Sequence, residues 1–91
     1  MKAPISNYIE LMRAFQLGQV EVEVFVRTFL QMFKGETGDL TEKEYDALQL
    51  LFGDADSFTT DDSLIESGGG FYIDEQELRR RVARTVRTMR E

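Results

Sequence analysis

The stretch DADSFTTDDSLIE, residues 54–66, joins two strongly patterned segments of the chain. Around a single aromatic residue, Phe58, it carries the carboxylates of Asp54, Asp56, Asp61, Asp62 and Glu66. The chain contains no His and no Cys, so the chemistry of this stretch is limited to carboxylates, hydroxyls and backbone groups. We therefore interpret it as a binding surface for a basic partner and not as a catalytic loop.

The 91 residues are enough for one domain with a modest core, and residues 1–91 are predicted to form it. The sequence contains no run of about 18 apolar residues, so no membrane span is predicted. The opening Met1-Lys2-Ala3-Pro4 leads into no apolar segment with a cleavage site, so no secretory signal is expected. The lack of cysteine fits a reducing cytoplasm.

Charge is distributed unevenly along the chain. Residues 1–33 are neutral, residues 34–78 hold two lysines against thirteen acids, and residues 79–91 hold six arginines against Glu91. Nucleic acids and anionic membranes are polyanions, so neither is the expected partner of the acidic centre. A basic protein surface is its natural complement, although charged runs also serve merely to solubilise small domains.

Two amphipathic helices are expected in the first part of the chain. Residues 4–17 place their apolar side chains at helical spacing: Ile5, Tyr8, Ile9, Met12 and Phe15. Residues 20–33 begin with alternating valines, as a strand does, but the stripe of Phe25, Phe29 and Phe33 favours a helix throughout. Aromatic residues at this spacing predict core packing more often than a ligand site.

Two further helices are predicted by their capping residues. Thr41 with Glu44 forms a capping box, and this helix is expected to end at Gly53. Asp74 with Glu77 repeats the pattern ahead of a buried line made by Leu78, Val82, Val86 and Met89. Four helices with short connections predict an all-α fold, an antiparallel four-helix bundle.

The glycine run and the arginine-rich end need separate interpretations. Gly68-Gly69-Gly70 lacks the spacing and the following Lys of a phosphate-binding loop, so we predict a flexible turn. The arginines from Arg79 to Arg90 raise the alternative of nucleic-acid binding. No aromatic residue is interleaved for base stacking, and the arginines can pair with nearby acids, as Glu75 can with Arg79.

Catalysis and metal binding find little support in the residues. Without His, the commonest general base and a common metal ligand are missing, so no enzyme activity, metal or cofactor is expected. Asp54-Ala55-Asp56 begins like a calcium-binding EF-hand loop. That motif then requires Gly where Thr59 stands and a bidentate Glu where Ile65 stands, so it is rejected.

The order of features resembles the small bacterial immunity proteins of the colicin D type, which are also found beside contact-dependent growth-inhibition toxins. The resemblance rests on short motifs that span nearly the whole chain. These are FQLGQ at 15–19, the Val24-Phe25 pair, YDAL at 45–48, DSFTTD at 56–61 and IDEQEL at 73–78.

The resemblance implies a helical protein that binds the basic C-terminal nuclease domain of a cognate toxin, often a tRNA-cleaving one, as a 1:1 complex. The family's acid-x-Phe-x-x-Asp pattern falls on Asp56, Phe58 and Asp61, with a shorter Asp where Glu is more usual. The predicted partner-binding residues are Asp54, Asp56, Phe58, Asp61, Asp62, Glu66 and Asp74. An acidic helical adaptor for a basic segment of another protein is the alternative, and self-association through Phe71 and Tyr72 stays open.

Overall fold

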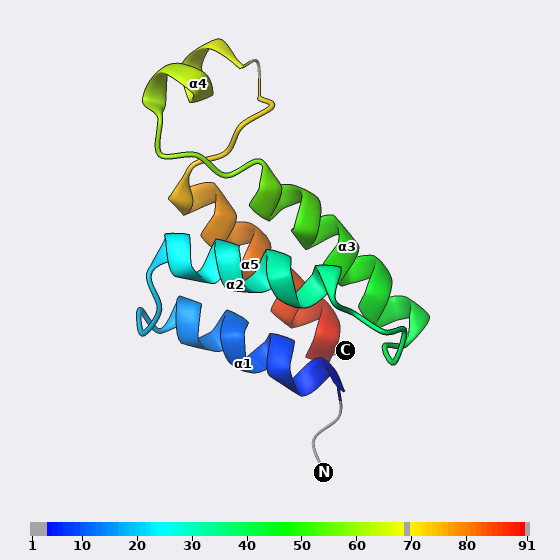
Figure 1. Ribbon diagram of the computed structural model, residues 1–91. Coiled ribbons are helices and arrows are strands. Elements are labelled where there is room, and N and C mark those ends of the chain that lie inside the picture. Colours follow the sequence, from blue (N-terminus) through cyan, green and yellow to red (C-terminus); the bar gives the residue numbers. More distant parts are fainter. Residues whose placement is uncertain (1–3, 69, 91) are drawn as a thin grey trace.

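The computed structural model describes residues 4–68 and 70–90, and the regular elements of this part are helices (Figure 1). They are α1 (Pro4–Gln16), α2 (Val22–Lys34), α3 (Glu42–Asp56), α4 (Asp62–Ser67) and α5 (Glu75–Arg90). The long helices run in alternating directions and pack as a closed ring, α1 on α2, α2 on α3, α3 on α5 and α5 on α1. The predicted all-α bundle is confirmed, and the short α4 is an addition that stands off one end.

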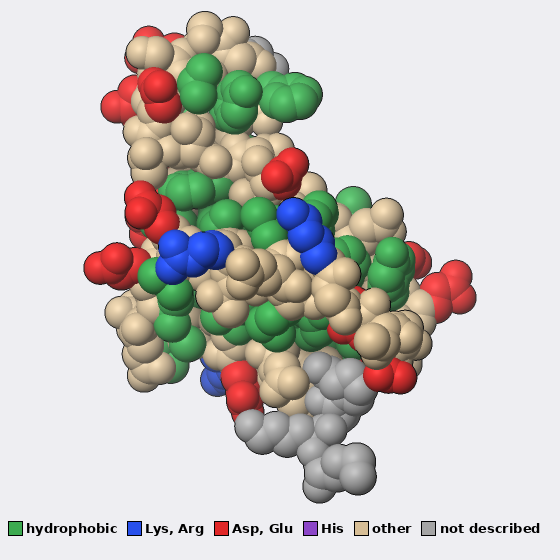
Figure 2. Space-filling view, in the orientation of Figure 1, with side chains coloured by type: hydrophobic (Ala, Val, Ile, Leu, Met, Phe, Trp, Pro, Cys, Tyr) green, Lys and Arg blue, Asp and Glu red, His purple; other side chains and the backbone are tan. Residues whose placement is uncertain are grey.

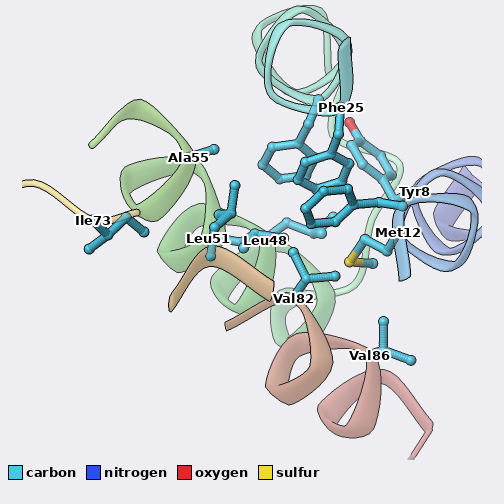
Figure 3. Close-up of a cluster of buried hydrophobic side chains, with 12 residues drawn as sticks. Tyr8, Met12, Phe25, Leu48, Leu51, Ala55, Ile73, Val82 and Val86 are labelled. Atoms are coloured by element: carbon cyan, nitrogen blue, oxygen red, sulfur yellow. The ribbon is translucent and has the colours of Figure 1, made fainter. Parts of the chain in front are cut away.

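The core of the bundle is built around stacked aromatic rings. Phe15 stacks on Phe25 with ring centroids 4.4 Å apart, and Phe25 stacks on Phe29 at 5.8 Å. Figure 3 shows aliphatic side chains of α3 and α5 closing over this cluster. The prediction that Phe25 and Phe29 are core residues is confirmed, whereas Phe33 is only half-buried and packs against the rings of Tyr45 and Phe52.

Helix α3 begins with the predicted capping box. The Glu44 N–H donates to Thr41 Oγ1 at 3.2 Å, and the Thr41 N–H donates to Glu44 Oε1 at 2.9 Å. The prediction that Gly53 ends this helix is wrong, because α3 continues to Asp56. The added turn buries Ala55 at 1 % exposure, and this packing outweighs the weak helix preference of glycine.

The start of the second helix also differs from expectation. Helix α2 begins at Val22, so Val20 and Glu21 precede it, and Glu21 occupies the N-cap position in extended backbone. Of the alternating valines only Val20 lies outside the helix, so the strand-like start of the pattern is mostly helical. No helix in the described part of the chain is long and apolar enough to cross a membrane.

Helix α5 is fixed to the bundle at its first turns. Asp74 caps it as predicted, since Asp74 Oδ1 accepts from the Glu77 N–H at 2.8 Å. The Arg79 guanidinium lies 4.2 Å from the centroid of the Phe15 ring and donates to the Phe15 carbonyl at 2.8 Å. These contacts tie α5 to the C-terminal end of α1, beside the connection that carries α4.

Candidate partner-binding lobe

The connection between α3 and α5 forms a separate lobe, which we define as residues 59–72 and name the acidic lobe. Its base is closed by a parallel bridge between Phe58 and Ile73. The Thr59 N–H donates to the Ile73 carbonyl at 3.0 Å, and the Ile73 N–H donates to the Ser57 carbonyl at 3.0 Å. Ile73 is buried in the core and Phe58 packs against it, so the base is anchored while the lobe projects (Figure 1).

A short helix, α4, shapes the first half of the acidic lobe. Asp61 caps it by accepting from the Ser63 N–H at 2.9 Å, and the Asp61 N–H donates to Thr59 Oγ1 at 3.1 Å. Six residues are too few to show a helical repeat of apolar side chains, which is why this helix was not predicted. The one available signal was the capping residue Asp61 itself.

Close packing fixes the second half of the lobe. A Cβ atom on Gly68 would lie 2.6 Å from the Leu64 carbonyl oxygen and 2.9 Å from Tyr72 Cδ2, so the Tyr72 ring requires a glycine beneath it. Gly70 has φ +88°, the left-handed region that favours glycine. Of the predicted glycine turn, Gly69 lies outside the described residues.

Most of the predicted binding residues are exposed on or beside this lobe. Asp61, Asp62 and Glu66 lie on the lobe itself, and Asp56 and Asp74 lie at its base. Figure 2 shows the lobe projecting with acidic side chains on its surface. The sequence has no Lys or Arg between Lys43 and Arg79, so no cation within the lobe neutralises these carboxylates.

Asp54 belongs to the bundle instead. Its side chain is 14 % exposed, with Oδ1 at 2.6 Å from Arg81 Nη1 and Oδ2 at 3.7 Å from Arg84 Nη2. The hydrogen bond to Asp54, followed by the one to Glu77, raises the pKa of Arg81 above its ordinary value. Asp54 therefore links α3 to α5 and offers little surface to a partner. Phe58 is also turned largely inward, since it is half-buried against the core.

Asp56, two residues further along the chain, is exposed to solvent and not held between helices. It is exposed in the last turn of α3, where the helix dipole disfavours an acid and no basic residue compensates. Within the described part of the chain its carboxylate has no hydrogen-bonding or ion-pairing partner. This placement of an acid at the negative end of the helix dipole costs stability, and no contact within the described part of the fold offsets it.

Most of the described arginines of α5 form ion pairs within the protein. Arg79 pairs with Glu75 at 2.8 Å, and Arg81 and Arg80 pair with Glu77 at 3.1 and 2.7 Å. The hydrogen bonds from Arg81 and then Arg80 hold the pKa of Glu77 below its usual value. The predicted pair of Glu75 with Arg79 is confirmed, and these pairs reduce the free positive charge that nucleic-acid binding would need, although Arg84 and Arg87 remain exposed.

The structure also adds apolar residues to the site. Phe71 is 73 % exposed and Leu64 is 38 % exposed, both on the acidic lobe. Neither belongs to the acidic pattern from which the binding residues were chosen. Within residues 4–68 and 70–90, no group of three or more acidic side chains is placed to hold a metal ion.

The fold and the lobe define a small helical domain with a projecting acidic surface. The profile of one family, described as bacterial self-protective colicin-like immunity, matches residues 3–89, and the chain belongs to this family. Its members act as inhibitors that confer immunity and not as enzymes, which agrees with the predicted lack of catalysis and confirms the resemblance seen in the sequence. Neither the curated proteins nor the solved structures contain a significant match to the chain.

Proposed function

We propose that the chain neutralises the C-terminal nuclease domain of a cognate toxin, a tRNase, by covering its basic active site with the acidic lobe. The observation that supports this is the lobe itself, which projects from the bundle and carries exposed carboxylates with no cation among residues 59–72. Family membership supplies the toxin as the partner. The nuclease character of the toxin is what the resemblance to the colicin D type implies, and the acidic charge of the lobe supports it.

Electrostatic complementarity supports a nuclease as the target. An enzyme that cleaves RNA must hold phosphates in a positive active site. Carboxylates on a rigid support can occupy the positions of those phosphates and exclude the substrate. The same charges steer the encounter and raise the association rate, which matters when even a few free toxin molecules are harmful.

We assign distinct roles to the predicted residues. Asp61, Asp62 and Glu66 on the lobe, with Asp56 and Asp74 at its base, face the toxin. Asp54 and Phe58 hold the base of the lobe on the bundle. One lobe per chain fits a 1:1 complex of a monomer, formed in the cytoplasm, where tRNA is found.

The test is protection of bacterial cells that co-express the toxin encoded beside this chain. Asp56→Asn combined with Asp61→Asn removes two charges, and asparagine at position 61 still caps α4. The matched control is Glu42→Gln with Asp46→Asn, two exposed acids on α3 away from the lobe.

Losing one member of a desolvated charge pair costs about 2 to 5 kcal/mol. The lobe variant should therefore bind about 100-fold more weakly or worse and fail to protect, while the control variant protects fully. Full protection by the lobe variant, with unchanged affinity for an inactivated toxin domain, rejects the lobe as the contact surface. The adaptor alternative predicts that the toxin is unaffected by the wild type and by both variants.

A further inference from the structure

We infer that Phe71 is an aromatic anchor that enters an apolar pocket on the partner, and that this pocket is bordered by Lys or Arg side chains. The inference rests on the proposed function and deepens it. Charge mimicry alone requires only carboxylates, whereas an anchor requires that the partner's basic surface be hollowed at one point to accept a ring.

The exposure of Phe71 is the first observation. At 73 % it is the most exposed large apolar side chain in the described part of the chain. A single exposed apolar residue is ordinary on protein surfaces. Here, however, Leu64 is also exposed on the same lobe, and Figure 2 shows hydrophobic side chains gathered on one side of the lobe with acidic ones on the other.

The second observation is that the exposed ring is held in place. The Phe71 ring meets the Tyr72 ring edge to face, with centroids 5.6 Å apart and an interplanar angle of 67°. Tyr72 is fixed in turn on Gly68, and the Phe71 N–H donates to the Gly68 carbonyl at 3.0 Å. A side chain ordered before binding loses less conformational entropy in the complex, which is the property of an interface anchor.

The surrounding charge identifies the chemistry of the partner. Interface anchors are typically aromatic residues in a desolvated pocket with a polar rim. Asp61, Asp62 and Glu66 are exposed on the same lobe and would meet the partner together with the ring, so basic side chains are expected on the partner surface around the pocket. A second copy of the chain would bring two acidic lobes together, and an anionic membrane would repel the lobe, so a basic protein fits better.

The test compares Phe71→Ala with Leu50→Ala in binding kinetics. Leu50 is the matched control, since it is 69 % exposed on α3. The probe is the nuclease domain of the toxin encoded beside this chain, made inactive by substitution and immobilised. Phe71→Ala should speed dissociation by about 10- to 100-fold with association changed less than about threefold, whereas Leu50→Ala should stay within about twofold.

A charge variant separates this inference from the proposed function. Asp62→Asn with Glu66→Gln should slow association. If that variant weakens binding and Phe71→Ala does not, the anchor is rejected and the acidic surface stands. If neither variant weakens binding, the proposed function fails as well. If Phe71→Ala instead converts a dimer of this chain to a monomer in sedimentation, with toxin binding unchanged, the ring serves self-association and the anchor is again rejected.

Discussion

Asp54 and Asp56 show how far two similar residues can diverge within one helical turn. The first faces Arg81 and Arg84 across the α3–α5 contact, and the second faces solvent. Asp54 entered the predicted binding set as part of the acidic run, and Asp56 through the pattern that the family resemblance implies. Separating them requires knowing that Arg81, 27 positions further on, lies beside one of them.

This difference predicts opposite effects on stability. Asp54→Ala should lower the free energy of unfolding by about 1 to 2 kcal/mol, less than for a fully buried pair, because Arg81 is partly exposed and keeps Glu77. Asp56→Ala should raise it by about 0.3 to 1 kcal/mol, because an acid leaves the negative end of the helix dipole. Urea denaturation measures both, and equal effects of the two variants would contradict these placements.

Tyr8 predicts a pH dependence of stability. Its hydroxyl lies 2.6 Å from Glu36 Oε1 and 3.1 Å from the Met32 carbonyl oxygen. Burial, followed by the hydrogen bond and the charge of Glu36, raises the pKa of Tyr8 above its ordinary 10.0. The stabilisation is therefore complete below pH 10 and is lost as the pH rises from there toward the raised folded-state pKa.

The measurement compares the wild type with Tyr8→Phe. At pH 7 the variant should be less stable by about 1 to 2 kcal/mol, because Glu36 and Met32 lose a donor. Between pH 9 and 11 the difference in unfolding free energy should shrink, since only the wild type has a phenol whose pKa is raised in the folded state. A difference that stays constant over this range would show that Tyr8 does not titrate as described.

Among the elements, those with local signals were predicted and those without were not. The starts of α3 and α5 follow from Thr41 with Glu44 and from Asp74 with Glu77, because a capping pattern lies within four residues. The full capping box is observed at α3, whereas at α5 the Glu77 carboxylate pairs with arginines and only the bond to Asp74 is observed. The end of α3 was misjudged because burial of Ala55 decides it, and burial is a property of the whole fold. Helix α4 is too short to reveal itself by periodicity.

The acidic lobe should unfold separately from the bundle. Gly68→Ala places a Cβ against the Leu64 carbonyl and the Tyr72 ring, an overpacking that costs about 1 to 3 kcal/mol locally. Amide protons of the lobe should then exchange about 5- to 150-fold faster, while the urea midpoint of the bundle changes little.

The control for this experiment is Gly53→Ala. Nothing lies within 4 Å of a Cβ at Gly53, and the residue is inside α3. This substitution should raise the free energy of unfolding by about 0.5 to 1 kcal/mol and leave exchange in the lobe unchanged. A fall in global stability with Gly68→Ala as large as the local effect would show that lobe and bundle unfold together.

At the scale of the whole molecule, the sequence predicted the bundle better than the lobe. Apolar spacing alone brings the helical faces together, so stripes such as Phe25 with Phe29 place the core. The lobe depends on a bridge between Phe58 and Ile73, which are far apart in sequence and carry no pairing signal. The acidic surface was therefore predicted as a set of charges, without its projection from the bundle.

The separation of charge predicts a strong effect of salt on complex formation. The acidic lobe and its base carry exposed carboxylates, while the arginines of α5 are mostly paired inside the protein. Raising NaCl from about 0.05 to 0.5 M should slow association with the toxin domain by about tenfold or more and change dissociation far less. Salt-independent association, measured by stopped-flow fluorescence, would reject electrostatic steering by the lobe.

The two hydrogen bonds at the base of the lobe have an evolutionary consequence. Packing of the core stops at Phe58 and Ile73, so under the proposed function replacements among residues 60–72 should alter recognition of the toxin and leave the folding of the bundle unchanged. If a toxin changes its surface and escapes inhibition, a few substitutions in the acidic lobe can then restore binding. If the acidic lobe carries specificity as proposed, exchanging it at this boundary for the lobe of another member of the family should transfer that member's specificity to this chain.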